Sequence, residues 1–92
     1  MSAQDKPQAD LLKLDFSIFL MSLIESAQMH LGDVPGPDGQ TERNLVLAQH
    51  NIDLLALLEE KTKGNLTGAE ESLLMRALEE LRQRFAEASK ET

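Results

Sequence analysis

Apolar residues recur with a helical period in three stretches of this chain, and glycine or proline separates the stretches. An apolar residue at every third or fourth position places its side chain on one face of an α-helix. The pattern predicts helices over about residues 16–31, 44–63 and 68–88, and no stretch has a convincing strand pattern. The links are short, so neighbouring helices should be antiparallel. We therefore predict an all-α fold: a small three-helix bundle of antiparallel helical hairpins.

The two ends of the chain are polar. Residues 1–14 are expected to form a mobile N-terminal tail, interrupted by Leu11, Leu12 and Leu14, which could pack as a lead-in against the bundle. Residues 89–92 are expected to be a polar C-terminal end, so residues 15–88 make up a single predicted helical domain.

Residues that cap helices stand at the predicted boundaries. Asp15 is a suitable N-cap for the first helix, and Gly32 can adopt the left-handed conformation just after its end. Either Thr41 or Asn44 can cap the second helix. The loop between these helices contains two prolines and two glycines within residues 34–39, which is typical of a connector that reverses direction.

The link between the second and third helices carries its own boundary signals. Gly64 fits the position after a helix end, and Lys61 and Lys63 complement the helix dipole there. Thr67 and Glu70 match a capping box for the third helix. The Lys61–Thr67 segment could alternatively bind an anion, but Glu70 and Glu71 would oppose one.

The first two helices carry more apolar surface than two neighbours can cover. An apolar patch on a small soluble protein usually marks an interface, and small cores often need help from a second chain. We therefore predict a homodimer with the first two helices near the interface, although scattered apolar side chains are also normal on protein surfaces. The predicted interface residues are Ile18, Met21, Met29, Val46, Asn51 and Leu57.

Asn51 is the one polar residue of this set and lies within the apolar arc of the second helix. A buried amide needs hydrogen-bond partners and can fix the register of paired helices. The alternative is an amide that is bonded to a neighbouring backbone carbonyl. The sequence does not choose between these two interpretations.

Charge and composition exclude several classes of function. The formal net charge is −7 and the basic residues are scattered, which disfavours binding to nucleic acids and to anionic membrane surfaces. The chain has no Cys, so it has no disulfide and no thiolate chemistry, which fits a reducing cytoplasm. Its most apolar stretch, residues 16–24, is far shorter than a membrane span. We expect a cytoplasmic protein.

No residue pattern predicts catalysis or a bound cofactor. His30 with Asp33, and His50 with Asp53, have the i, i+3 spacing of a metal-binding pair, but further ligands are missing. The helical serines lack an oriented base, and adjacent glutamates diverge by about 100° on a helix. We predict no enzyme activity, no cofactor and no metal. A metal or small-molecule site that uses His30 or His50 is the alternative.

Several segments together resemble a small, functionally uncharacterised bacterial family, the domain of unknown function 1844. The similar segments are residues 15–17, 30–32, 44–45, 52–53 and 61–67, and the closing Leu81-Arg82 with Phe85. The resemblance covers about residues 15–87, and its most specific element is the Lys61–Thr67 string. It implies a bacterial cytoplasmic helical domain without a known activity. We therefore expect a non-enzymatic module for self-association and protein interaction.

Overall fold

The computed structural model describes residues 15–91 of the chain, most of which lie in three α-helices. These are α2 (Phe16–Leu31), α3 (Leu45–Lys61) and α4 (Gly68–Glu91). The described residues contain no strand, which confirms the all-α prediction. The tail predicted over residues 1–14 lies outside the described residues.

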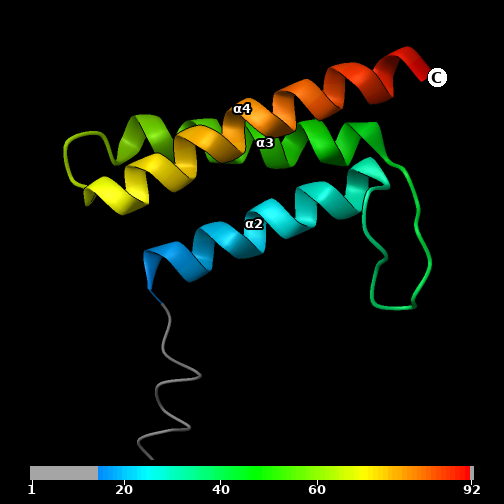
Figure 1. Cartoon of the computed structure of the whole chain (residues 1–92), viewed down its shortest axis with the longest axis horizontal. Coiled ribbons are helices and arrows are strands. Elements are labelled where there is room, and N and C mark those ends of the chain that lie inside the picture. Colours follow the sequence, from blue (N-terminus) through cyan, green and yellow to red (C-terminus); the bar gives the residue numbers. More distant parts are fainter. Residues whose placement is uncertain (1–14, 92) are drawn as a thin grey trace, which may run out of the picture.

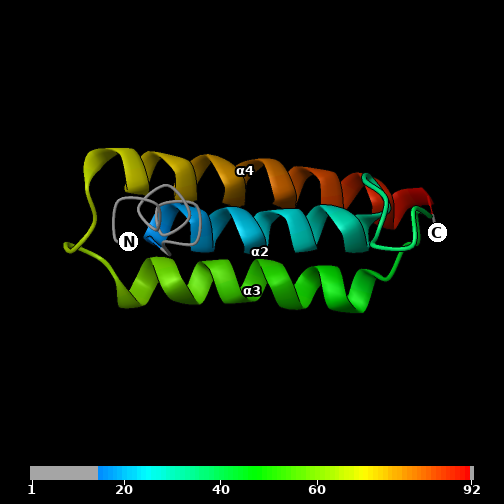
Figure 2. The ribbon, with the colours of Figure 1, turned by 90° about the horizontal axis from the view of Figure 1, so that it is seen from below.

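Every pair of helices is in contact. Figure 1 shows α3 running opposite to α2 and α4, so α2 and α4 point in the same direction. Figure 2 shows α2 lying over the space between α3 and α4, with residues 32–44 looping at one end of the bundle. This arrangement creates three seams, one between each pair of helices.

The ends of α2 are set by local hydrogen bonds. Asp15 Oδ1 accepts from the Ile18 backbone N–H at 2.9 Å, which satisfies a free donor in the first turn. Gly32 ends the helix with a φ of +81°, a left-handed conformation that a Cβ atom disfavours. The helix therefore begins and ends where the sequence predicts.

At the start of α3, Asn44 is the N-cap and Thr41 is not. Asn44 Oδ1 accepts from the Leu47 N–H at 3.1 Å, and its own N–H donates to the His30 carbonyl at 2.7 Å. The helix ends at Lys61, two residues before the predicted end. The Thr62 hydroxyl donates to the Leu58 carbonyl at 2.6 Å, and Gly64 has a φ of +81° in the turn that follows.

A capping box begins α4. Thr67 Oγ1 accepts from the Glu70 N–H at 3.1 Å, while Glu70 Oε1 accepts from the Thr67 N–H at 2.9 Å. The helix continues to Glu91, three residues beyond the predicted end, because no glycine or proline stops it. Arg43 from the long loop holds this extension through an ion pair with Glu91 at 2.8 Å.

The core is aliphatic and lies along the common axis of the helices. It consists of leucine, isoleucine and alanine, with Phe16 and Phe85 only partly buried at its edge. Its buried members are Leu20, Ala27, Leu31, Ala48, Ile52, Leu55, Leu74, Leu78, Leu81 and Ala88. Each helix buries one narrow stripe, which leaves apolar side chains beside all three seams.

Candidate interaction surfaces

The six predicted interface residues differ in their exposure. Four of them are exposed in the isolated chain: Ile18 (43%), Met21 (58%), Val46 (80%) and Leu57 (49%). Met29 is half-buried, and Asn51 is buried with 7% of its surface exposed. The structure also exposes three large apolar residues outside the predicted set: Phe19, Leu47 and Met75.

Asn51 lies between α2 and α3 and contributes little to the outer surface. Its Oδ1 accepts from the Ser26 hydroxyl at 3.4 Å, which joins α3 to α2. The partner is a side chain on another helix of the same chain, so neither interpretation from the sequence describes it fully. The bond fixes the register of α2 against α3 within one chain.

Met29 is covered by the loop that follows α2. Its sulfur would lie 3.7 Å from a Cβ atom added at Gly36, which places the loop backbone against the side chain. Pro37 and Gln40 line the same hollow. Met29 is therefore less exposed than the other four apolar residues of the set because the loop covers it.

Two rows of residues, one on α2 and one on α3, are joined by the hydrogen bond between Ser26 and Asn51. Each row has the spacing i, i+4, i+7, i+11, so its members follow one side of a helix. We call these rows, with the adjacent Leu57, the α2–α3 face. The rows are Phe19, Leu23, Ser26 and His30 on α2, and Leu47, Asn51, Leu54 and Leu58 on α3.

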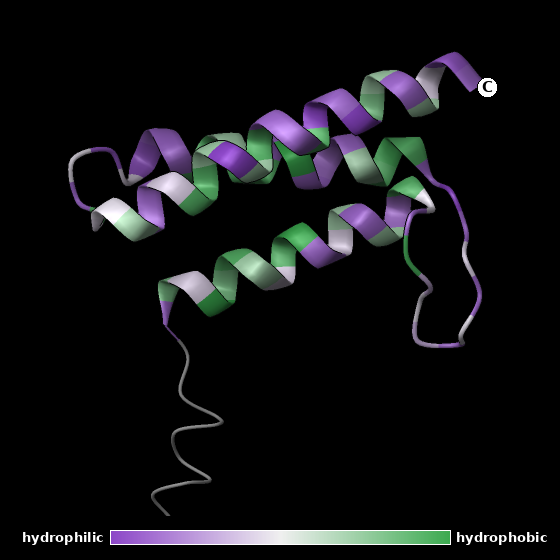
Figure 3. Ribbon diagram, in the orientation of Figure 1, coloured by the Kyte–Doolittle hydropathy of each residue, from purple (hydrophilic) through white to green (hydrophobic). Residues whose placement is uncertain are grey.

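The α2–α3 face has no Asp, Glu, Lys or Arg. Phe19 is 38% exposed and Leu47 is 42% exposed, at opposite ends of the face. The whole of α2 carries one such residue, Glu25, among its 16 residues, whereas α4 carries ten among 24. Figure 3 shows the contrast between an α2 that is largely green and an α4 that is largely purple.

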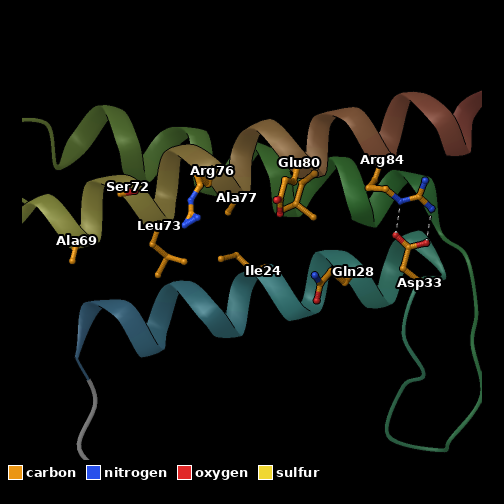
Figure 4. Close-up of a pocket in the computed structure, with 11 residues that line it drawn as sticks. Ile24, Gln28, Asp33, Ala69, Ser72, Leu73, Arg76, Ala77, Glu80 and Arg84 are labelled. Atoms are coloured by element: carbon orange, nitrogen blue, oxygen red, sulfur yellow. Dashed lines mark hydrogen bonds and ion pairs between the residues drawn. The ribbon is translucent and has the colours of Figure 1, made fainter.

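A groove of about 550 Å³ runs along the seam between α2 and α4. Figure 4 shows Ile24 of α2 and Leu73 of α4 facing each other across it. Ala77 adds to the apolar lining, and Arg76 and Glu80 of α4 supply its charges. The groove can hold an apolar chain segment beside charged groups of both signs.

An ion pair closes one end of the groove. Arg84 donates to Asp33 through two parallel hydrogen bonds, Nε to Oδ2 at 3.0 Å and Nη2 to Oδ1 at 2.8 Å (Figure 4). It also donates to Glu87. The hydrogen bonds from Arg84 lower the pKa of the Asp33 carboxyl below its ordinary value. The same bonds raise the pKa of the Arg84 guanidinium. The pair ties the end of α2 to α4.

Ile18 and Met21 belong to the same seam as this groove. They line a second hollow with Glu25, and this hollow shares Ile24, Gln28 and Leu73 with the larger groove. Val46 lies elsewhere, in a shallow hollow between α3 and α4 that His50 and Phe85 also line. The predicted interface residues are thus distributed over different seams and do not form one surface.

The two histidines do not gather metal ligands. Asp33 binds Arg84, and Asp53 accepts from Gln49 Nε2 at 2.8 Å, so each spaced carboxylate has another partner. Within residues 15–91, no group of three His, Asp or Glu side chains could hold a metal ion. His30 and His50 also line different hollows, the first under the long loop and the second between α3 and α4.

The Lys61–Thr67 segment serves as the connection between two helices. The Glu70 carboxylate already accepts from the N–H of Thr67, at the position where an anion at the start of α4 would bind. An incoming anion would have to displace this carboxylate.

None of the helices in residues 15–91 has the length and hydropathy required to span a bilayer.

The model of the domain of unknown function DUF1844 matches residues 13–87 of the chain. The chain belongs to the DUF1844 family. The DUF1844 match contains the α2–α3 face and the whole lining of the α2–α4 groove. No curated protein and no solved structure matches the chain.

Proposed function

We propose that this protein is a non-enzymatic helical module that forms a homodimer through the α2–α3 face. The proposal depends mainly on one observation: this face bears exposed Phe19, Leu47 and Leu57 and no charged side chain. Surfaces that are depleted of charge and rich in large apolar side chains are typical of interface cores. A second copy would supply a matching face, because a two-fold axis pairs each surface with itself.

The net charge favours this face for contact between identical chains. Each copy carries a formal charge of −7, so two copies repel each other over most of their surface. The α2–α3 face has no carboxylate, so a dimer through this face would not bring the carboxylates of the two copies together. Two acidic chains can therefore approach closely there at the lowest electrostatic cost.

Only three polar side chains lie on this face: Ser26, His30 and Asn51. The Ser26 hydroxyl donates to the Asn51 side chain of the same chain. Within residues 15–91, no buried side-chain polar atom lacks a hydrogen bond. Covering the face with a second copy would leave few polar groups without partners, which keeps the desolvation cost small.

Sedimentation velocity over a range of concentrations tests the proposal. We expect the wild-type chain to sediment as a dimer at micromolar concentration, and Leu47→Glu to sediment as a monomer. Val46→Glu is the matched control, because Val46 is 80% exposed in the same helical turn but lines the α3–α4 hollow. Both substitutions add one acidic residue near the start of α3, where the helix dipole favours it.

The two variants separate the possible outcomes. A dimer that persists in Val46→Glu and dissociates in Leu47→Glu, with equal helicity by circular dichroism, supports the α2–α3 face. A monomeric wild type contradicts dimerisation itself. Loss of the dimer in Val46→Glu but not in Leu47→Glu would place the interface on the α3–α4 side and overturn the assignment.

A further inference from the structure

The α2–α4 groove remains open in the described part of the chain, and the proposed dimer does not cover it. Ile18 is 43% exposed and Met21 is 58% exposed on its α2 side. Leu73 is only half-buried on its α4 side. A groove with this apolar lining gains stability when an apolar segment fills it.

The chain itself supplies such a segment at the correct end of the groove. Residues 10–14 read Asp-Leu-Leu-Lys-Leu and lead directly into Asp15, the N-cap of α2. Ile18 and Met21 lie in the first two turns of α2 and line the hollow that continues into the groove. The exposed apolar lining therefore begins near the point where residues 10–14 join α2. The family match begins at residue 13, which includes the end of this segment.

The length of the segment agrees with the length of the groove. Five residues before Asp15 can reach at most about 16 Å, at roughly 3.3 Å per residue. Along α2, Ile24 lies about 14 Å from Asp15, at 1.5 Å per residue. The segment can therefore turn back beside α2 and reach the level of Ile24 and Leu73, but not the Asp33–Arg84 pair at the far end.

The charges also match. Within residues 15–91 the structure gives Arg76 no ion pair, and its guanidinium lines the groove. Asp10 is the residue of the segment furthest from Asp15 in the sequence, so it would reach furthest along the groove if the segment turned back beside α2. We propose that residues 10–14 bind in the α2–α4 groove of their own chain, with the leucines against Ile24 and Leu73 and with Asp10 beside Arg76.

Disulfide trapping in the full chain tests this placement directly, because the chain has no native Cys. The test variant combines Asp10→Cys with Arg76→Cys. The control variant combines Asp10→Cys with Met75→Cys, which is one residue away on α4 but does not line the groove. We expect an intrachain disulfide to form at least about tenfold faster in the test variant, because the bound segment raises the effective concentration of its thiol.

A second variant shows whether the leucines cause the proximity. Adding Leu11→Ser, Leu12→Ser and Leu14→Ser to the test variant should reduce its rate to that of the control. Circular dichroism checks that the helices remain folded in this variant. Three outcomes would overturn the proposal. The test and control variants could form the disulfide at equal rates, or the disulfide could join two chains. The fast rate could also persist after the serine changes. None of these results depends on whether the chain dimerises through the α2–α3 face.

Discussion

At the scale of single residues, the Asp33–Arg84 pair is the most specific long-range contact. The two residues are 51 positions apart, and their two parallel hydrogen bonds hold the end of α2 against α4. The pKa of Asp33 lies below its ordinary value of 3.8 in the folded chain, so folding favours the ionised carboxylate. The stabilisation from this pair is therefore complete above the unfolded pKa and is lost as the pH falls through the lower folded pKa.

The lowered pKa of Asp33 leads to a prediction for Asp33→Asn. At neutral pH the variant should unfold at a lower urea concentration than wild type, because it lacks the charged partner of Arg84. The difference between the two midpoints should shrink as the pH falls below about 4, where the wild-type carboxylate also takes up a proton. Urea titrations at several pH values measure this difference. A constant gap across the acid range would contradict the assigned role of the carboxylate.

At the scale of whole elements, the helix ends depend on single side-chain caps. The Thr67 hydroxyl accepts from the Glu70 N–H, and we expect Thr67→Ala to destabilise the chain by about 1 kcal/mol. Thr41→Ala is the matched control, because Asn44 and not Thr41 caps α3. The control should leave the free energy of unfolding nearly unchanged. Chemical denaturation of both variants checks the prediction, and equal losses would show that the capping box contributes nothing specific.

The same locality explains which elements could be predicted from the sequence. Asp15, Gly32 and the Thr67–Glu70 pair act within three residues of the helix ends that they cap, so their patterns are visible in the sequence. The last turn of α4 has no such local signal. It is held by an ion pair between Arg43 and Glu91, which are 48 residues apart, and sequence spacing alone does not reveal such a contact.

The sequence pattern also did not predict which seam of the bundle each exposed apolar residue lies beside. A helical wheel shows that Met21, Val46 and Leu57 lie outside the main apolar stripes, but it does not show which helix lies beside each of them. The positions depend on how the three helices rotate about their axes when they pack. For that reason four of the predicted interface residues are exposed, but they divide among different seams. Asn51, by contrast, is enclosed by its own chain.

At the scale of the whole molecule, a homodimer links stability to concentration. If folding and association through the α2–α3 face are coupled, mass action stabilises the folded dimer as the protein concentration rises. A tenfold increase in concentration contributes about 1.4 kcal/mol per dimer, or about 0.7 kcal/mol per chain. For a chain of this size we expect the thermal midpoint to rise by about 3–5 °C.

The midpoint of Leu47→Glu should not change with concentration, while that of Val46→Glu should follow wild type. Differential scanning calorimetry at two concentrations makes the comparison. Midpoints of the wild type that do not depend on concentration would mean that one chain folds without its copy, and the exposed Phe19, Leu47 and Leu57 would then need another explanation.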